Sequence, residues 1–204
     1  MSVELKPVVD LPQMSEEEFA AWCDEDTRAE FVDGTVALMS PVSRAHYQSS
    51  KFLLTLLEAY LQQRPLGELL GPEVAVRLRA GLRRVPDLLF VAAEHAGRIR
   101  ETLVEGAPDA VWEIISPESE ERDWREKFPE YEAAGVREYW LVNPLLRTAY
   151  LYRLNAEGRY ERVEEADERL VSEAIPGFWL KPAWLWQEPR PRILDCLREL
   201  GALE

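Results

Sequence analysis

The segment Val85-Pro-Asp-Leu-Leu-Phe-Val-Ala92 predicts a strand that is buried on both faces, because its apolar residues follow one another without the alternation of a half-exposed strand. The segment Asp109-Ala-Val-Trp-Glu-Ile-Ile-Ser116 has the same character. Glu138-Tyr-Trp-Leu-Val-Asn143 predicts a third strand, which ends before Pro144. Strands come first along the chain, then a strand-helix-strand unit, then further strands. This order is typical of an α/β or α+β domain with a mixed central sheet flanked by helices.

Capping residues and turn dipeptides locate the other elements. Ser15 and Ser43 are suitable N-caps for two helices, and Asp33-Gly34 predicts the turn of a hairpin. Pro129 lies inside a third helical stretch, which either bends there or begins late. Helices are thus predicted over 15–23, 44–63, 119–134 and 191–200, hairpins over 28–39 and 148–163, and an alternating strand over 73–79. The apolar positions of the second helix are Tyr47, Leu54, Leu57, Tyr60 and Leu61.

Composition narrows the class of protein. The chain has 204 residues, which suits a single domain over 1–204 with its own hydrophobic core. Two cysteines are too few for a disulfide framework or a cysteine-based zinc site. No apolar run reaches the roughly 18 residues of a membrane span, and the N-terminus lacks the profile of a signal peptide. We therefore expect a cytoplasmic protein with no membrane partner.

The net charge of −14 comes from 24 basic and 38 acidic side chains. Proteins that coat nucleic acid without specificity are usually basic, because Lys and Arg displace counterions from the phosphates. The charge argues against a passive coating role and leaves room for an enzyme that gathers carboxylates around a metal ion. Arg77, Arg79, Arg83 and Arg84 could form a basic ridge leading to Asp87, or they could form structural ion pairs with the many acids.

Two carboxylates lie in the two most apolar strands. Asp87 stands at the start of one strand, and Glu113 interrupts the apolar run of the other. A carboxylate in such a strand is costly unless it is paired, hydrogen-bonded or bound to a metal ion. Asp87 could simply cap its strand, and Glu113 could pair with a buried arginine. Two carboxylates on adjacent strands could also hold Mg²⁺ or Mn²⁺ through oxygen ligands.

These residues and their surroundings resemble a known family. The segments that carry the resemblance are Glu30-Phe-Val-Asp-Gly34, Met39-Ser-Pro41 followed by His46, Pro86-Asp87, Pro108-Asp109, Trp112-Glu-Ile-Ile-Ser-Pro117, Asp123 with Lys127, and Gly135-Val-Arg-Glu-Tyr-Trp-Leu-Val142. Together they are similar to the Uma family of putative restriction endonucleases, within the PD-(D/E)XK nuclease superfamily. The resemblance covers about 28–155, and a C-terminal extension at about 165–204 carries no motif.

The resemblance implies a restriction-endonuclease-like fold and a magnesium-dependent phosphodiesterase. Asp87, Glu113 and the backbone carbonyl of Ile114 would then be ligands of Mg²⁺ or Mn²⁺. Where the superfamily has a lysine, this chain has Ile115. Lys127, on the following helix, would replace that lysine, since the reaction needs a cation to orient water and to offset charge on the phosphate.

Two further residues are candidates for the same site. Glu30 would be a fourth member reaching in from the N-terminal hairpin, or else an exposed strand residue. His46, near a helix start, could act as general base or contact a phosphate, although such a histidine more often caps or packs. His95, in a polar loop, is assigned no role.

The role of Lys127 rests on spacing and on residue choice. Asp123 lies four residues before it, so the two could form an exposed ion pair on one helix face. The chain has four lysines and twenty arginines, however, so a lysine is an uncommon choice. Its compact charge on a flexible stem can approach water or phosphate where a planar guanidinium fits poorly. We therefore predict that the Lys127 ammonium lies close to the Glu113 carboxylate, in the same cleft as Asp87.

The C-terminal tryptophans bear on assembly. Trp179, Trp184 and Trp186 are more than one small domain is expected to bury, which favours a subunit interface. A homodimer or a dimer of dimers is therefore predicted, as suits an enzyme that cuts both strands of a duplex.

Three functions stay open from the sequence. The first is a metal-dependent endonuclease whose partner is nucleic acid, DNA before RNA. The second is a catalytically idle binding or assembly protein with the same fold, which the acidity favours. The third is a metal-dependent hydrolase of another substrate.

Overall fold

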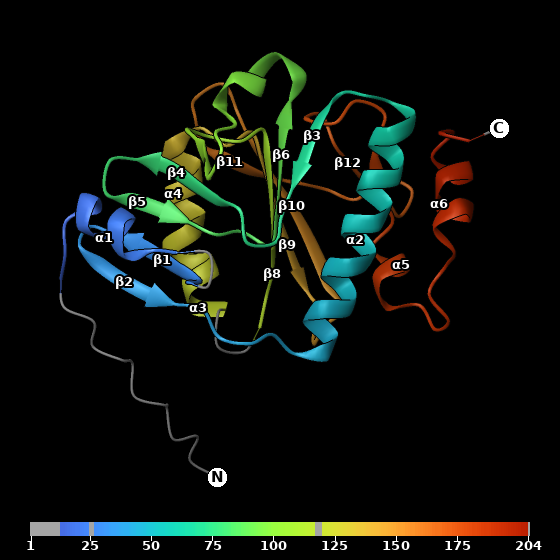
Figure 1. Ribbon diagram of the computed structural model, residues 1–204. Helices are drawn as coiled ribbons and strands as arrows, with labels where there is room; N and C mark the ends of the chain where they lie inside the picture. The colour runs from blue at the N-terminus through green and yellow to red at the C-terminus, as the bar shows by residue number, and fades with distance from the viewer. Residues whose placement is uncertain (1–12, 25–26, 117–119, 204) are drawn as a thin grey trace, which may run out of the picture.

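The computed structural model describes residues 13–24, 27–116 and 120–203. Its centre is a six-stranded mixed sheet (Figure 1). β8 and β9 are parallel neighbours, and the other adjacent pairs are antiparallel. The order across the sheet is β11 (Tyr160–Val163), β10 (Thr148–Leu154), β9 (Glu138–Asn143), β8 (Ala110–Ile114), β6 (Leu88–Ala92) and β3 (Gly67–Leu70). The mixed sheet and the three buried strands predicted from the sequence are confirmed.

Both faces of this sheet are covered, because its central strands are apolar on both sides. On β8, Trp112 and Ile114 face one core, and Val111 faces the other. The first core packs against α2 (Arg44–Gln63), with α5 (Ala183–Trp186) and α6 (Ile193–Glu199) beyond it. The second core is covered by α4 (Phe128–Ala134) and by a second sheet, and Figure 1 shows α2 and α4 on opposite sides of the central strands.

The second sheet has five strands, in the order β2 (Thr35–Leu38), β1 (Ala29–Val32), β5 (Leu82–Arg84), β4 (Ala75–Arg79) and β7 (Leu103–Glu105). Asp33 and Gly34 both have positive φ, 45° and 95°, as the two-residue turn between β1 and β2 requires. The predicted hairpin is therefore confirmed. α1 (Glu16–Trp22) begins at the predicted capping box and packs Phe19 against Phe31 of β1.

The segment between β8 and β9 is helical, as predicted, but its middle is wider than an α-helix. α3 (Glu120–Arg122) leads into a π-helical turn, Asp123–Lys127, which is followed by α4. Pro129 lies in the first turn of α4, where its missing N–H is least costly. The helix therefore continues through the proline and ends at Gly135, whose φ is 87°. The predicted start at residue 119 lies outside the described residues.

The remaining elements are short. They are a 3₁₀ turn η1 (Ala93–Arg98), and β12 (Leu170–Val171) paired with β13 (Trp179–Leu180). In α2, the apolar positions Leu57, Tyr60 and Leu61 are buried and Leu54 is half-buried, whereas Tyr47 is 56% exposed. Tyr47 is four residues after Ser43, at the open N-terminal end of the helix. Within the described part of the chain, no helix has the length and apolar character needed to cross a membrane.

The C-terminal segment belongs to the same core as α2. Phe178, Leu180 and Leu185 are buried in it together with Trp184, which is 3% exposed. Trp179 and Trp186 pack against that core and are half-buried. One of the three tryptophans is thus fully buried in the domain, and the other two remain partly exposed. The oligomeric state stays a prediction.

Candidate functional site

Side chains from five parts of the chain meet at the end of the central sheet where β8 stops and β6 begins. Leu88 of β6 pairs with Trp112 of β8, so Asp87 and Glu113 follow in register at the same end. Glu30 comes from β1, Lys127 from the π-helical turn, and His46 from α2. The structure therefore brings together the five residues that the sequence predicted as catalytic candidates.

Lys127 is the centre of this group and is 3% exposed. Its Nζ lies 2.8 Å from Glu113 Oε1, 3.2 Å from Glu30 Oε1 and 3.6 Å from Asp123 Oδ1. Burial lowers the pKa of Lys127, but the surrounding carboxylates outweigh this and raise it above its ordinary value. The expected closeness of Lys127 to Glu113 is confirmed, and the alternative of an exposed ion pair with Asp123 is wrong.

Glu113 has an unusual electrostatic environment. Its Oε1 accepts hydrogen bonds from the Lys127 ammonium and from the Tyr131 hydroxyl, at 2.8 and 2.9 Å. Burial raises the pKa of Glu113; the charge of Lys127 lowers it, and the charges of Asp123, Asp87 and Glu30 raise it further, to about 8. Glu113 therefore takes up a proton more readily than an exposed glutamate does.

Glu30 is fixed by a second cation. Arg84, 1% exposed, lies on β5 and donates to Glu30 Oε2 at 2.8 Å. Burial raises the pKa of Glu30, but the charges of Lys127 and Arg84 outweigh this and hold the pKa at about 2. The other nitrogens of Arg84 bind Glu130 at 2.7 and 2.8 Å, so the guanidinium ties β5 to α4. Glu30 is therefore charged and buried, and the alternative of an exposed strand residue is wrong.

Asp87 lies on the more open side of the site and its side chain is 15% exposed. Its Oδ2 accepts the backbone N–H of Ile114 at 2.7 Å, which ties the start of β6 to the end of β8. Its Oδ1 lies 3.1 Å from His46 Nε2. Asp87 thus bridges β8 and α2, and His46 acts on the site through it. The Ile114 side chain is buried in the α2 core, and metal ligation by its carbonyl stays a prediction.

The donor set suits a hard cation. Carboxylate oxygens are the ligands that Mg²⁺ prefers, and it is usually bound through one or two carboxylates, with water and substrate phosphate completing the shell. Asp87 and Glu113 are such a pair. Among the described residues, no three or more His, Cys, Asp or Glu side chains are arranged to hold a metal ion. The residues fit an ion that is shared with water and substrate.

Two members of the site were not foreseen. Tyr131 follows Lys127 by four residues, so the helical spacing itself places both on one face. For Arg84 and its neighbours the sequence left open a basic ridge or structural ion pairs. The structure shows the ion pairs, because nearby acids bind the arginines of β4 and β5. The pairs are Arg77 with Glu16 and Glu105, Arg79 with Asp33, Arg83 with Glu16, and Arg84 with Glu30, Glu126 and Glu130.

His95 lies apart from this site. Its Nδ1 is 2.9 Å from the carboxylate of Asp109, which is buried at the other end of β8 and also accepts the backbone N–H of Ala92. The histidine thus packs on a structural carboxylate.

Comparisons with known proteins agree with this fold. The profile of the Uma2 family, described as "Putative restriction endonuclease", matches residues 16–183. A crystal structure described as a putative nuclease belonging to DUF820, from Anabaena variabilis ATCC 29413, is 16% identical with a TM-score of 0.65 and covers 92% of this chain and 99% of its own. No curated protein was found to match the chain. Since the family match extends over most of the sequence, this protein belongs to the Uma2 family of putative restriction endonucleases.

Proposed function

We propose that this protein is a metal-dependent endonuclease that hydrolyses phosphodiester bonds of nucleic acid, with Asp87 and Glu113 holding Mg²⁺ or Mn²⁺. The observation that carries this proposal is the Lys127 ammonium, buried 2.8 Å from Glu113 and beside Glu30. Burying a lysine among acids costs free energy, because the charges lose their hydration. Chemistry that needs a fixed positive charge explains this arrangement best. Membership of this family supports a nucleic-acid substrate, and we propose DNA in preference to RNA.

Each residue has a role that follows from its contacts. When bound, the metal ion would lower the pKa of a water molecule and offset charge on the phosphate. Lys127 keeps its proton, because its pKa is raised, and it can orient water or stabilise the transition state. Glu30 positions Lys127 and is itself held by Arg84. Tyr131 directs its hydroxyl to Glu113 and so fixes the orientation of that carboxylate.

His46 has a supporting position in this scheme. Its Nε2 contacts Asp87, and its side chain is 9% exposed. A histidine beside a metal-binding carboxylate fixes the orientation of that carboxylate, as outer-shell partners do in metal sites. We assign His46 as a positioning residue for Asp87 in preference to a general base.

The test is a cleavage assay with four substrates, single- and double-stranded DNA and RNA, with and without Mn²⁺. Metal-dependent cleavage by the wild type that is lost in Glu113→Ala supports the proposal. Glu157→Ala is the matched control, because Glu157 is exposed in the turn between β10 and β11. Cleavage that persists in Glu113→Ala would point to a contaminating nuclease. No cleavage of any substrate would favour an idle scaffold, the second candidate, which the net charge of −14 supports.

A further inference from the structure

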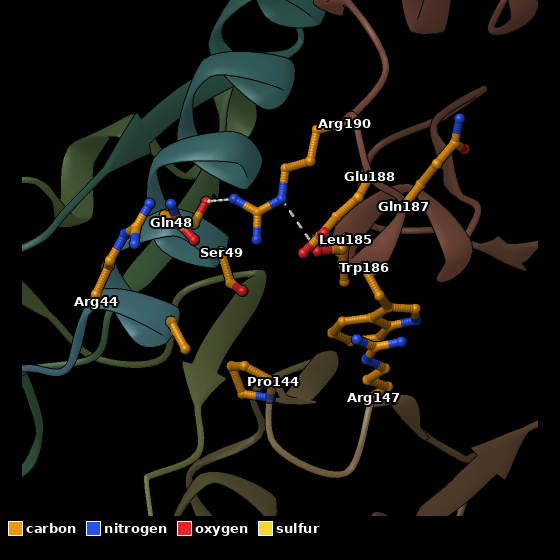
Figure 2. A pocket seen from close by; sticks show the side chains of 11 residues that line it. Arg44, Gln48, Ser49, Pro144, Arg147, Leu185, Trp186, Gln187, Glu188 and Arg190 are labelled. Atoms are coloured by element: carbon orange, nitrogen blue, oxygen red, sulfur yellow. Dashed lines mark hydrogen bonds between the residues drawn. The ribbon is translucent and has the colours of Figure 1, made fainter.

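A second feature lies next to the candidate site, on the α2 side of the central sheet. It is a cavity of about 620 Å³, a size typical of ligand pockets (Figure 2). Three segments enclose it: the first turns of α2, the turn that follows β9, and the segment around α5. The lining residues are Arg44, Ala45, Gln48, Ser49, Pro144, Arg147, Leu185, Trp186, Gln187, Glu188 and Arg190.

The lining is basic in an acidic protein. It has three arginines, Arg44, Arg147 and Arg190, against the single acid Glu188. Within the described ranges, none of the three arginines has a carboxylate within ion-pair distance. The β4 and β5 arginines, in contrast, are all paired. These three guanidinium groups are therefore available to bind an anion in the pocket.

The N-terminal part of α2 adds to this preference for an anion. Its first turn contains no acidic residue, so the positive end of the helix dipole is not offset. Ser49, one turn further along, is fully buried, and its Oγ has no hydrogen-bond partner among the described residues. Figure 2 shows this hydroxyl directed toward the space between α2 and Pro144. A buried hydroxyl without a partner marks a place where a ligand can supply one.

An aromatic surface faces the same space. Trp186 is half-buried and lines the pocket together with Arg147. Arg190 holds the segment near Trp186 against α2, since it donates to the carbonyls of Gln48 and Leu185 at 2.6 and 3.1 Å. A tryptophan and arginines around one groove are the combination with which proteins bind unpaired nucleotides, the ring stacking on a base and the guanidinium groups on phosphates.

The pocket is connected to the candidate site through two elements. His46 contacts Asp87 from the same turn of α2 whose Ala45 and Ser49 line the pocket. Val142 of β9 pairs with Ile114 of β8, and Pro144 follows two residues later. The two sites therefore share an end of the sheet.

The turn beside the pocket also presents apolar side chains. Leu145 and Leu146 are 63% and 67% exposed, and their N–H groups donate to Asn143 Oδ1, which holds the turn. They lie in sequence between the lining residues Pro144 and Arg147. Exposed apolar side chains on a fixed turn can insert between bases and unstack them.

We propose that this pocket binds an unpaired nucleotide of the nucleic acid at the neighbouring site, an inference that rests on the function proposed above. Trp186 stacks on the base, Arg44 and Arg147 bind the backbone phosphates, and Ser49 Oγ donates a hydrogen bond to the bound nucleotide. The protein accordingly prefers single-stranded or locally unpaired substrate over intact duplex.

The experiment measures binding without cleavage. Fluorescence anisotropy of a labelled oligothymidylate of about 12 nucleotides is followed in EDTA, with the full-length protein and with the same sequence as a duplex. We expect Trp186→Ala to weaken binding about tenfold, and Trp186→Phe to restore most of it. Arg147→Ala should reduce the salt dependence of log K by about one unit of slope. Trp22→Ala and Arg100→Ala are the controls, because both residues are exposed elsewhere on the surface.

Several outcomes would overturn the proposal. It fails when Trp186→Ala and Arg147→Ala bind as well as their controls, when the duplex binds more tightly than the single strand, or when Trp186→Phe does not restore binding in a folded protein. The proposed function is judged separately, by cleavage in Mn²⁺. If the wild type cleaves, and the pocket variants bind and cleave as the wild type does, the proposed function stands and the proposed role of the pocket is rejected. A wild type that neither binds nor cleaves contradicts both.

Discussion

Glu113 and Glu138 are buried carboxylates on neighbouring strands of one sheet, but the groups that surround them are very different. Glu138 begins β9 and is 1% exposed, and Glu113 lies near the end of β8 and is 4% exposed. Both lie in strands whose other residues are mostly apolar. They differ in the number and the kind of groups that surround them.

Glu138 is saturated by donors. It accepts from the Arg153 guanidinium at 3.3 and 3.4 Å, and from the Ser172 hydroxyl at 2.7 Å. The backbone N–H groups of Glu173 and Ala174 and the indole of Trp140 also donate to it, so both oxygens are used. These contacts join β9 to β10 and to the C-terminal segment. Glu138 is therefore a structural carboxylate.

Glu113 has fewer donors and more competing acids. Both of its hydrogen bonds go to Oε1, and none among the described residues reaches Oε2. Three other carboxylates act on its charge. A fold that merely needed to bury a carboxylate would supply donors, as at Glu138. Crowded acids with one free oxygen are instead typical of sites that act on a cation or a proton.

The largest expected effect separates the two by activity. Glu113→Gln should lower the cleavage rate at least about 10²-fold, more than the loss of an outer-shell partner, because the variant loses the charge that, in the proposed function, holds the metal ion. Glu138→Gln should cleave at the wild-type rate per folded molecule. Single-turnover rates in Mn²⁺ measure this. Equal loss in both variants would mean that Glu113, too, is structural.

The second effect separates them by stability. Glu138→Gln removes the charge from a buried pair with Arg153 and should lower the free energy of unfolding by about 3 kcal/mol. For a chain of this size, the melting temperature should fall by roughly 6–12 °C. Glu113→Gln should melt within about 2 °C of the wild type in EDTA, since it relieves repulsion among acids. Calorimetry gives both values, and a reversed order would contradict the comparison.

The third effect concerns the metal ion. Mn²⁺ at about ten times its dissociation constant should stabilise the folded protein by about 1.4 kcal/mol, which raises the melting temperature by roughly 3–6 °C. Asp87→Ala combined with Glu113→Ala should abolish the shift, whereas Glu157→Ala should leave it unchanged. Isothermal titration gives the affinities independently. A double variant that binds Mn²⁺ as tightly as the wild type would show that the ion lies elsewhere.

The smallest effect is a difference in the sign of pH dependence. Glu16 is a second saturated carboxylate, whose hydrogen bonds from Arg77 lower its pKa from 4.5 to about 2. The folded state binds fewer protons there, so its stabilisation is present above pH 4.5 and is lost as the pH falls toward 2. Glu113 has a raised pKa, so its contribution is largest below pH 4.5 and is lost as the pH rises toward 8.

Two glutamine variants measure these slopes in EDTA. Glu16→Gln should lose about 1 kcal/mol at pH 7, as for a partly screened ion pair, and little at pH 2. Glu113→Gln should flatten the decline between pH 4.5 and 8. Unfolding in urea across this pH range gives both curves, and slopes of the same sign would contradict the assigned environments.

Much of the fold follows from local patterns. The hairpin turn at Asp33-Gly34, the helix beginning after Ser43 and the buried strands were all predicted, because turn chemistry, capping and apolar runs act over a few residues. Helical spacing groups Tyr47 with the other apolar positions of α2, but it does not show where the neighbouring core ends, and Tyr47 is exposed. The sequence likewise left open whether the arginines of β4 and β5 form a basic ridge or ion pairs, since the acids that pair with them lie up to 67 residues away in sequence.

In the candidate site, too, some features follow from the sequence and others depend on the tertiary structure. Asp87 and Glu113 could be picked out from the chain alone, because a carboxylate inside an apolar run conflicts with its surroundings wherever the strand packs. The burial of Lys127, the support of Glu30 by Arg84 and the crowding that raises the pKa of Glu113 depend on packing a helix and a second sheet against β8. Electrostatic environments are sums over neighbours in space, and here those neighbours come from β1, β5, β6 and the π-helical turn. Only the tertiary structure places them within a few ångströms of one another.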